Sequence, residues 1–184
     1  SKKIADAAKR FGAKVPFLRK AKFSEDLTTT ETTLQNALLE YEDYIGKKFD
    51  ICVFLTCTNI FRKVEWIRFA VQQLKKNYRL DSVFSVHHLY KHFWHYKKNK
   101  PTKVLSWMKD YTSRQIAPKL FREDTGLTCA TRASFWRKGK RIGNNVKFII
   151  NKDTITGLDI HNEMDLELAK AAIKYLKRKK IKYF

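Results

Sequence analysis

Short apolar runs alternate with helical patterns through the first half of the chain, and this alternation constrains the fold more than any other feature. Residues 49–55 form an apolar run typical of a strand buried in a parallel sheet. Residues 64–78 follow a helical period, and residues 82–86 form a second apolar run. The order strand, helix, strand predicts an α/β fold with right-handed crossovers and a mainly parallel sheet.

Two further helical patterns precede the first apolar run. Ile4, Ala7, Ala8 and Phe11 share one helical face, and Gly12 ends that pattern. Residues 28–30 provide a cap for a second helix over about residues 34–41, and residues 13–18 between them suggest a short extended segment. The chain opens on a helix with no strand before it. We therefore expect a fragment, or a chain trimmed at its N-terminus.

The second half of the chain differs in character. Residues 87–107 are rich in aromatic and basic side chains and predict strands without a long helix. Residues 127–131 and 146–151 predict two more strands, and residues 163–178 predict a final amphipathic helix. There are no repeats and no Pro/Ser/Gly linker. We expect one domain, residues 1–184, with an irregular insertion at 87–143.

Charge and composition restrict the classes of partner. The chain has 39 basic and 18 acidic residues, a net charge of +21, and 43% hydrophobic residues. The basic residues are scattered, which favours an anionic ligand or a solubility role over nucleic acid. No run approaches the roughly 20 apolar residues of a membrane span. Three cysteines without CxxC spacing are typical of a reducing compartment.

The stretch from residue 157 to residue 166 carries the clearest site signal. If residues 158–161 are extended, Asp159 and His161 point to the same face. Asn162 is a good helix N-cap with Asp165 three residues later, so both have a structural explanation. Asp159 has none, and it lies where α/β folds bind ligands. The spacing leaves a metal role, another ligand role and a structural role open.

Two loops offer polar groups for an anionic ligand. Arg114, Gln115 and Arg122 lie in one of them, and arginine forks suit carboxylate or phosphate oxygens. The alternative is that Arg122 pairs with one of the two acidic residues that follow it. Thr56 and Arg62 follow the first apolar run, where the ligand crevice of a parallel sheet lies. Arg62 has the alternative of capping the strand edge or pairing with a nearby glutamate.

Four of the five histidines, His87, His88, His92 and His95, fall within nine positions. No cysteine lies near them and they do not form HExxH spacing, which argues against zinc. No Walker loop, GxSxG motif or Ser-His-Asp order is present. Covalent catalysis by a side-chain nucleophile therefore has no support.

These stretches occur in the order found in cytidylyltransferases that form CMP-sialic acid and related CMP-nonulosonates, and the chain resembles that family over nearly its whole length. The matching segments are residues 14–19 and 24–26 ("VPF-R-P…L-S-x-D"), 55–62 ("LQPTSPLR"), 81–86 ("DSVVSV"), 114–115 ("RQ"), 159–161 ("DID") and the final helix. Three departures stand out. The N-terminal loop that grips CTP is absent, the "LQPTSPLR" stretch is altered, and His161 replaces the second metal aspartate.

The resemblance implies a Rossmann-like nucleotidyltransferase domain and a reaction. An acidic 2-keto sugar attacks the α-phosphate of CTP, and pyrophosphate leaves with the help of Mg²⁺. Asp159 and His161 would be the metal positions, and Arg114 would be catalytic beside Asp159. The substrate-binding residues would be Lys91, Gln115, Thr56, Arg62 and Arg122, with Lys91 and Arg114 facing the sugar carboxylate.

The resemblance also implies a partner and a location. Family members are cytoplasmic homodimers whose middle segment reaches the neighbouring subunit, which suits residues 87–143 as a dimerisation and sugar-binding insertion. The partners expected are CTP, an acidic sugar and a second copy of the chain, with no membrane and no nucleic acid. The alternative function is a non-catalytic basic α/β module that binds a nucleotide or a nucleic acid, with salt-sensitive binding as its signature.

Overall fold

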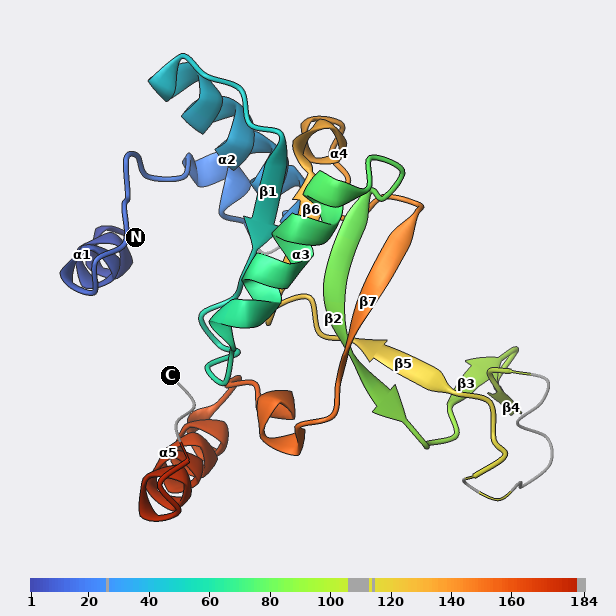
Figure 1. The fold of residues 1–184 in the computed structure, drawn as a ribbon. Coiled ribbons are helices and arrows are strands. Elements are labelled where there is room, and N and C mark those ends of the chain that lie inside the picture. Colours follow the sequence, from blue (N-terminus) through green and yellow to red (C-terminus); the bar gives the residue numbers. More distant parts are fainter. Residues whose placement is uncertain (26, 106–112, 114, 182–184) are drawn as a thin grey trace. The chain divides into compact units, whose positions relative to one another are not determined.

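The structure is a computed structural model that describes residues 1–25, 27–105, 113 and 115–181 (Figure 1). Its α-helices are α1 (Lys2–Arg10), α2 (Thr30–Ile45), α3 (Val64–Lys76), α4 (Ala133–Arg137) and α5 (Glu163–Arg178). Its strands are β1 (Ile51–Phe54), β2 (Ser82–Leu89), β3 (Trp94–Lys97), β4 (Lys100–Lys103), β5 (Leu120–Glu123), β6 (Cys129–Arg132) and β7 (Val146–Asn151). Two 3₁₀ turns are η1 (Ala21–Phe23) and η3 (Thr154–Gly157).

The fold is mixed α/β, and its main sheet is mostly antiparallel. The strand order is β1-β6-β2-β5, and β7 pairs with β2. Ile51 of β1 lies opposite Arg132 of β6, and Val86 of β2 lies opposite Glu123 of β5, both in antiparallel register. The prediction of a mainly parallel sheet is therefore wrong. An apolar run indicates that a strand is buried but not its direction, and β1 pairs with a strand from the second half of the chain.

The predicted helices are confirmed, and their ends have local causes. The side chain of Thr29 accepts a hydrogen bond from Thr32 N at 3.1 Å at the start of α2. Gly46 ends that helix in the left-handed region, with φ of 64°, which glycine adopts without steric cost. Residues 13–18, expected to be extended, form no strand. The predicted cap at residues 28–30 lies at the start of α2, and the helix extends beyond the predicted residues 34–41 at both ends.

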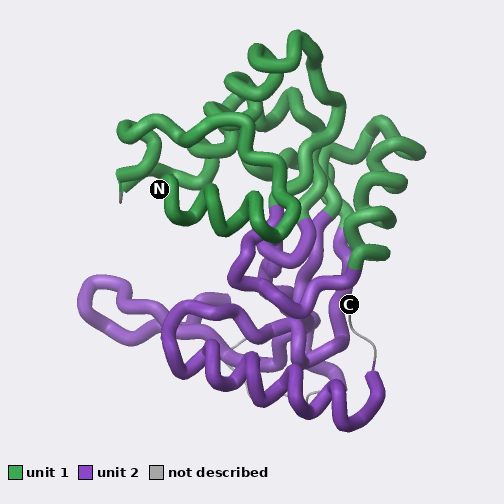
Figure 2. The backbone as a smooth tube through the Cα atoms, turned by 90° about the vertical axis from the view of Figure 1, so that its left-hand side faces the viewer, with its two compact units in different colours: residues 1–54, 64–83, 129–147 green, residues 55–63, 84–128, 148–184 purple. Residues whose placement is uncertain are grey.

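Two compact units divide the chain (Figure 2). The first comprises residues 1–54, 64–83 and 129–147, and the second comprises residues 55–63, 84–128 and 148–184. Strands β2 and β7 contribute residues to both units. The single domain over 1–184 and the dimerisation insertion at 87–143 both stay predictions.

The first unit has an apolar core beside a buried ion pair. Leu38 of α2 packs with Ala133 and Trp136 of α4. Glu42 is 2% exposed and binds Arg137 by two hydrogen bonds, of 2.6 Å and 3.1 Å. The hydrogen bond from Arg137 lowers the pKa of Glu42 to about 2, against the opposing effect of burial. This pair joins α2 to α4.

Candidate functional site

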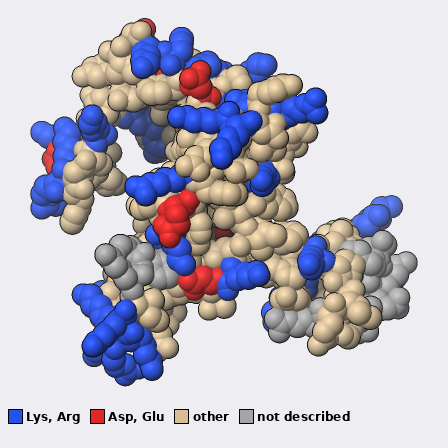
Figure 3. Space-filling view, in the orientation of Figure 1, with Lys and Arg blue, Asp and Glu red and all other residues tan. Residues whose placement is uncertain are grey.

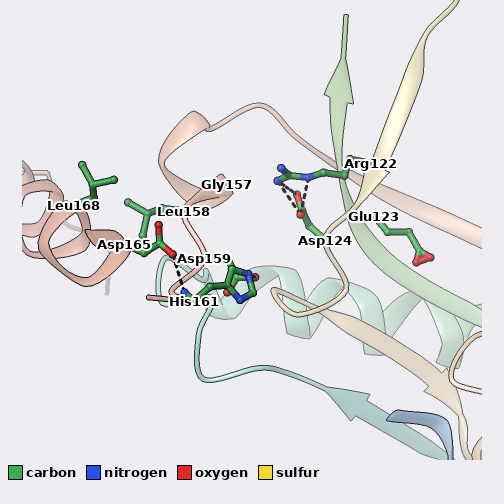
Figure 4. A pocket seen from close by; sticks show the side chains of 9 residues that line it. All are labelled: Arg122, Glu123, Asp124, Gly157, Leu158, Asp159, His161, Asp165 and Leu168. Carbon is green, nitrogen blue, oxygen red and sulfur yellow. Dashed lines mark hydrogen bonds and ion pairs between the residues drawn. The ribbon is translucent and has the colours of Figure 1, made fainter. Parts of the chain in front are cut away.

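A pocket of about 550 Å³ lies within the second unit (Figure 4). Three segments form it: the end of β5 with the residue after it, the chain that leaves η3, and the first two turns of α5. Its lining residues are Arg122, Glu123, Asp124, Gly157, Leu158, Asp159, His161, Asp165 and Leu168. Three of the residues that the sequence predicted for the site, Arg122, Asp159 and His161, are therefore brought together.

The start of α5 fixes one wall of the pocket. Asn162 accepts a hydrogen bond from Asp165 N at 3.0 Å, and Asp165 accepts one from Asn162 N at 3.2 Å, which completes a capping box. Asp165 also accepts a hydrogen bond from His161 N at 2.9 Å. The carboxylate of Asp165 therefore holds the chain as it enters the helix, in agreement with the structural role predicted for it.

Asp159 and His161 lie close together at this wall. His161 Nε2 is 3.1 Å from Asp159 Oδ2, and the two side chains are 72% and 34% exposed respectively. Asp159 Oδ1 is buried and has no hydrogen-bond partner among the residues that the structure describes. A buried carboxylate oxygen without a partner is costly. Asp159 thus brings a buried carboxylate acceptor to this pocket.

Arg122 forms the pairing that the sequence left open as an alternative. Its Nε and Nη2 donate to the two carboxylate oxygens of Asp124, each at 3.1 Å. This two-point geometry is the arginine fork that matches a carboxylate. The Arg122 side chain is 47% exposed, and Asp124 is 11% exposed. Arg122 therefore orients Asp124 while it still faces solvent at the pocket.

Arg62 and Thr56 lie elsewhere in the second unit. Arg62 Nε donates to Leu127 O at 2.9 Å, and its Nη2 donates to Thr56 O at 2.5 Å and to Gly126 O at 2.8 Å. Burial lowers the pKa of Arg62. The Thr56 hydroxyl donates to Asn59 Oδ1 at 2.6 Å. Neither side chain lines the pocket, and the backbone contacts of Arg62 tie two loops together.

The other predicted residues are not brought to the pocket by the described part of the chain. Lys91 lines a cavity of about 20 Å³ together with Ala117 and Pro118. Gln115 is exposed, and its backbone N–H donates to Ser113 Oγ at 3.3 Å. Arg114 lies outside the described residues.

Sequence reasoning missed Asp124 as a site residue, because it appeared only as an alternative partner for arginine. The sequence feature that could have identified Asp124 is its position one residue after β5, with Arg122 two residues before it on the same face. Across residues 1–25, 27–105, 113 and 115–181, no three His, Cys, Asp or Glu side chains gather as metal ligands.

Comparison with known proteins gives one partial relationship. No protein-family model matches the chain. Seventy-two residues, 39% of this chain, are 38% identical to the CMP-N,N'-diacetyllegionaminic acid synthase of Legionella pneumophila. The match covers 31% of that protein, so the chain spans about a third of its relative. Over those residues the chain resembles a cytidylyltransferase. None of the described helices has the length and apolar character needed to cross a membrane.

Proposed function

We propose that the chain is part of an enzyme that transfers CMP from CTP to an acidic 2-keto sugar of the nonulosonate type and releases pyrophosphate. The observation that carries this proposal is the 38% identity over 72 residues with a protein named as a CMP-sugar synthase. The order of the motifs along the chain supports it, and so does a pocket at the residues of the "DID" motif. The finer assignments below are part of the same proposal.

In this reaction a hydroxyl oxygen of the sugar forms a bond to the α-phosphorus of CTP. The bond from that phosphorus to the bridging oxygen of the β-phosphate breaks, pyrophosphate leaves, and a base takes the hydroxyl proton. The protein then contributes chiefly positioning and electrostatic stabilisation. A pocket with charged side chains at its rim suits that role.

Asp159 is the residue that fits a magnesium ion. Mg²⁺ prefers oxygen ligands and is often held by one or two carboxylates together with substrate phosphates and water. Asp159 supplies a buried carboxylate oxygen without a partner in the described structure. His161 lies beside it, and imidazole suits Mg²⁺ less well, so His161 would contact the ion through water. When bound, the ion neutralises charge on the leaving pyrophosphate.

The remaining assignments follow from the resemblance. Arg122 keeps Nη1 outside its fork with Asp124, which would let it bind substrate. Lys91, Arg114 and Gln115 would reach the same substrate when the middle segment meets a second copy of the chain. Arg62 and Thr56 would shape the loop rather than touch substrate. A cytoplasmic homodimer completes the proposal.

Pyrophosphate release by the full-length natural protein tests this function. The protein is supplied with CTP, Mg²⁺ and a panel of neutral and acidic sugars, and release is expected only with nonulosonate-like acids. Asp159→Asn keeps the shape of the side chain, and we expect turnover to fall by about 100-fold or more. Asp43→Asn, at an exposed position of α2, is the matched control and should retain turnover. Unchanged turnover in Asp159→Asn would refute the metal assignment.

The basic surface of α5 favours a second candidate, a module that binds nucleic acid. Lys174, Lys177, Lys179 and Lys180 are exposed and lie at or just beyond the C-terminal half of the helix. Figure 3 shows basic side chains gathered over α5. Cations at a helix C-terminus also complement the helix dipole, which is the competing explanation.

Charge reversal at two places separates this candidate from a general charge effect. We would measure fluorescence anisotropy of a 20-nucleotide single-stranded RNA at several salt concentrations. For a binding module, Lys174→Glu/Lys177→Glu should weaken binding by about tenfold and reduce the salt dependence. Lys2→Glu/Lys3→Glu on α1 makes the same change in net charge. Equal losses in both double variants would indicate non-specific attraction and reject the α5 site.

A further inference from the structure

His87 lies at the centre of a polar network in the second unit. Its side chain is 13% exposed. Nδ1 contacts Asp124 Oδ2, and Nε2 is 2.9 Å from Thr156 Oγ1 and 3.2 Å from Asp153 O. One imidazole ring on β2 therefore touches both the residue after β5 and the turn η3. These are two of the three segments that form the pocket.

The contacts determine which ring nitrogen carries the proton. Burial lowers the pKa of His87 below its ordinary value, which favours the neutral ring with a single N–H. An ionised carboxylate only accepts, so Nδ1–H donates to Asp124. Nε2 faces the Thr156 hydroxyl and the Asp153 carbonyl, and that hydroxyl donates its single proton to Asp153 O. The opposite tautomer would place a nitrogen lone pair against the carboxylate.

Both partners of the ring are held firmly by other contacts. Thr156 is 0% exposed, and its hydroxyl accepts from Asn151 Nδ2 and donates to Asp153 O at 2.7 Å. Asp124 is gripped by the fork of Arg122, and its backbone N–H donates to Ser85 O at 2.9 Å. The ring of His87 thus joins two fixed groups. Because Thr156 is fully buried, its hydroxyl is excluded as a nucleophile.

We propose that His87 is a positioning residue that clamps η3 to Asp124 and thereby places Asp159 at the pocket. Asp159 follows the last residue of η3 by two positions, and the intervening Leu158 lines the pocket with it. A shift of η3 would move the unpartnered oxygen of Asp159 directly. The inference deepens the proposed function and rests on it for its kinetic consequence only.

Protonation of the ring would change the contact between His87 and η3. Asp153 favours the charged ring, Arg122 opposes it, Asp124 contacts Nδ1, and Lys63 lies 3.6 Å from Asp153. Once Nε2 carries a proton, it can donate to Asp153 O and to Thr156 Oγ1, which lie 3.2 Å and 2.9 Å away. The geometry of η3 should therefore change with the charge of His87.

Two variants of His87 separate its contact with Asp124 from its contact with Thr156. His87→Asn keeps an amide donor near the place of Nδ1 and loses the contact with Thr156. His87→Gln keeps a polar group near the place of Nε2 and loses the contact with Asp124. Thr156→Val removes the hydroxyl at nearly constant volume. His88→Gln is the matched control, because His88 is the next residue of β2 and packs on Tyr90 and Phe121 instead.

The first measurement does not depend on activity. Nitrogen NMR of the histidine ring should show the Nδ1–H tautomer, and the amides of η3 should shift with the midpoint of His87 as the pH falls. Hydrogen exchange should quicken by about fivefold or more at the amides of Thr156 and Leu158 in His87→Asn and Thr156→Val. Those amides donate to Asp153 O and Ile155 O. The Arg132 amide in the first unit, which donates to Asp81 O, should not change.

A second measurement connects the clamp to catalysis. In the pyrophosphate assay His87→Asn should lower kcat by about tenfold with little change in KM for CTP, and His87→Gln should recover part of the loss. If the natural protein releases no pyrophosphate, the proposed function fails, and the exchange data still decide the clamp. An Nε2–H tautomer, or exchange at Thr156 and Leu158 equal to that in His88→Gln, would overturn the proposal.

Discussion

Replacing Arg62 by methionine should destabilise the protein, because its guanidinium is bonded to three backbone carbonyls rather than exposed to a ligand. The acceptors are the carbonyls of Thr56, Gly126 and Leu127, at 2.5 to 2.9 Å. Methionine retains the apolar stem and removes all three donors. Each hydrogen bond lost costs about 1 kcal/mol net, so the sum is about 3 kcal/mol.

Thermal and urea unfolding measure this effect. A loss of about 3 kcal/mol corresponds to a fall of about 6–12 °C in Tm for a chain of this length. Arg68→Met is the control, since Arg68 is an exposed arginine on α3, and it should change the free energy of unfolding by less than about 0.5 kcal/mol. Tryptophan fluorescence and circular dichroism should report the same midpoint if unfolding is two-state.

A substrate-binding role for Arg62 would give the opposite pattern. Stability of Arg62→Met within the range of the Arg68→Met control, together with a raised KM for either substrate, would refute the structural reasoning. It would restore the role that the sequence predicted for this arginine.

Three further perturbations test other parts of the structure. The pKa of Glu42 is lowered from 4.5 to about 2, so its contribution to stability should be present above pH 4.5 and lost as pH falls towards 2. In urea unfolding, the free energy of unfolding should differ less between pH 7 and pH 3 in Glu42→Gln than in the natural protein. Gly126→Ala would overlap Asn59 Oδ1 and Thr56 Oγ1, and should cost about 1–3 kcal/mol, which Asn59→Ala should partly restore in a double-variant unfolding cycle. Asn162→Ala removes the cap of α5 and should cost about 1 kcal/mol, measured by thermal unfolding, with faster hydrogen exchange in the first turn.

The sequence by itself determined the local structure of this protein. Residues 146–151 and 163–178 were predicted as a strand and a helix, and the structure has β7 and α5 at those positions. The roles of Asn162 and Asp165 in capping were also predicted, because a cap involves residues within four positions of each other. The sequence also singled out Asp159, because its neighbours Asn162 and Asp165 had a structural explanation and Asp159 had none.

Only the tertiary structure decided how distant segments meet. The apolar run at 49–55 does not predict that β1 pairs in antiparallel register with β6. Arg62 found its carbonyl partners more than 60 residues away, in the loop at Gly126 and Leu127. His87 appeared in the sequence as one of four clustered histidines, and its partners Asp124 and Thr156 are separated from it by 37 and 69 residues. Local periodicity indicates which residues are buried, but long-range hydrogen bonds depend on how the whole chain packs.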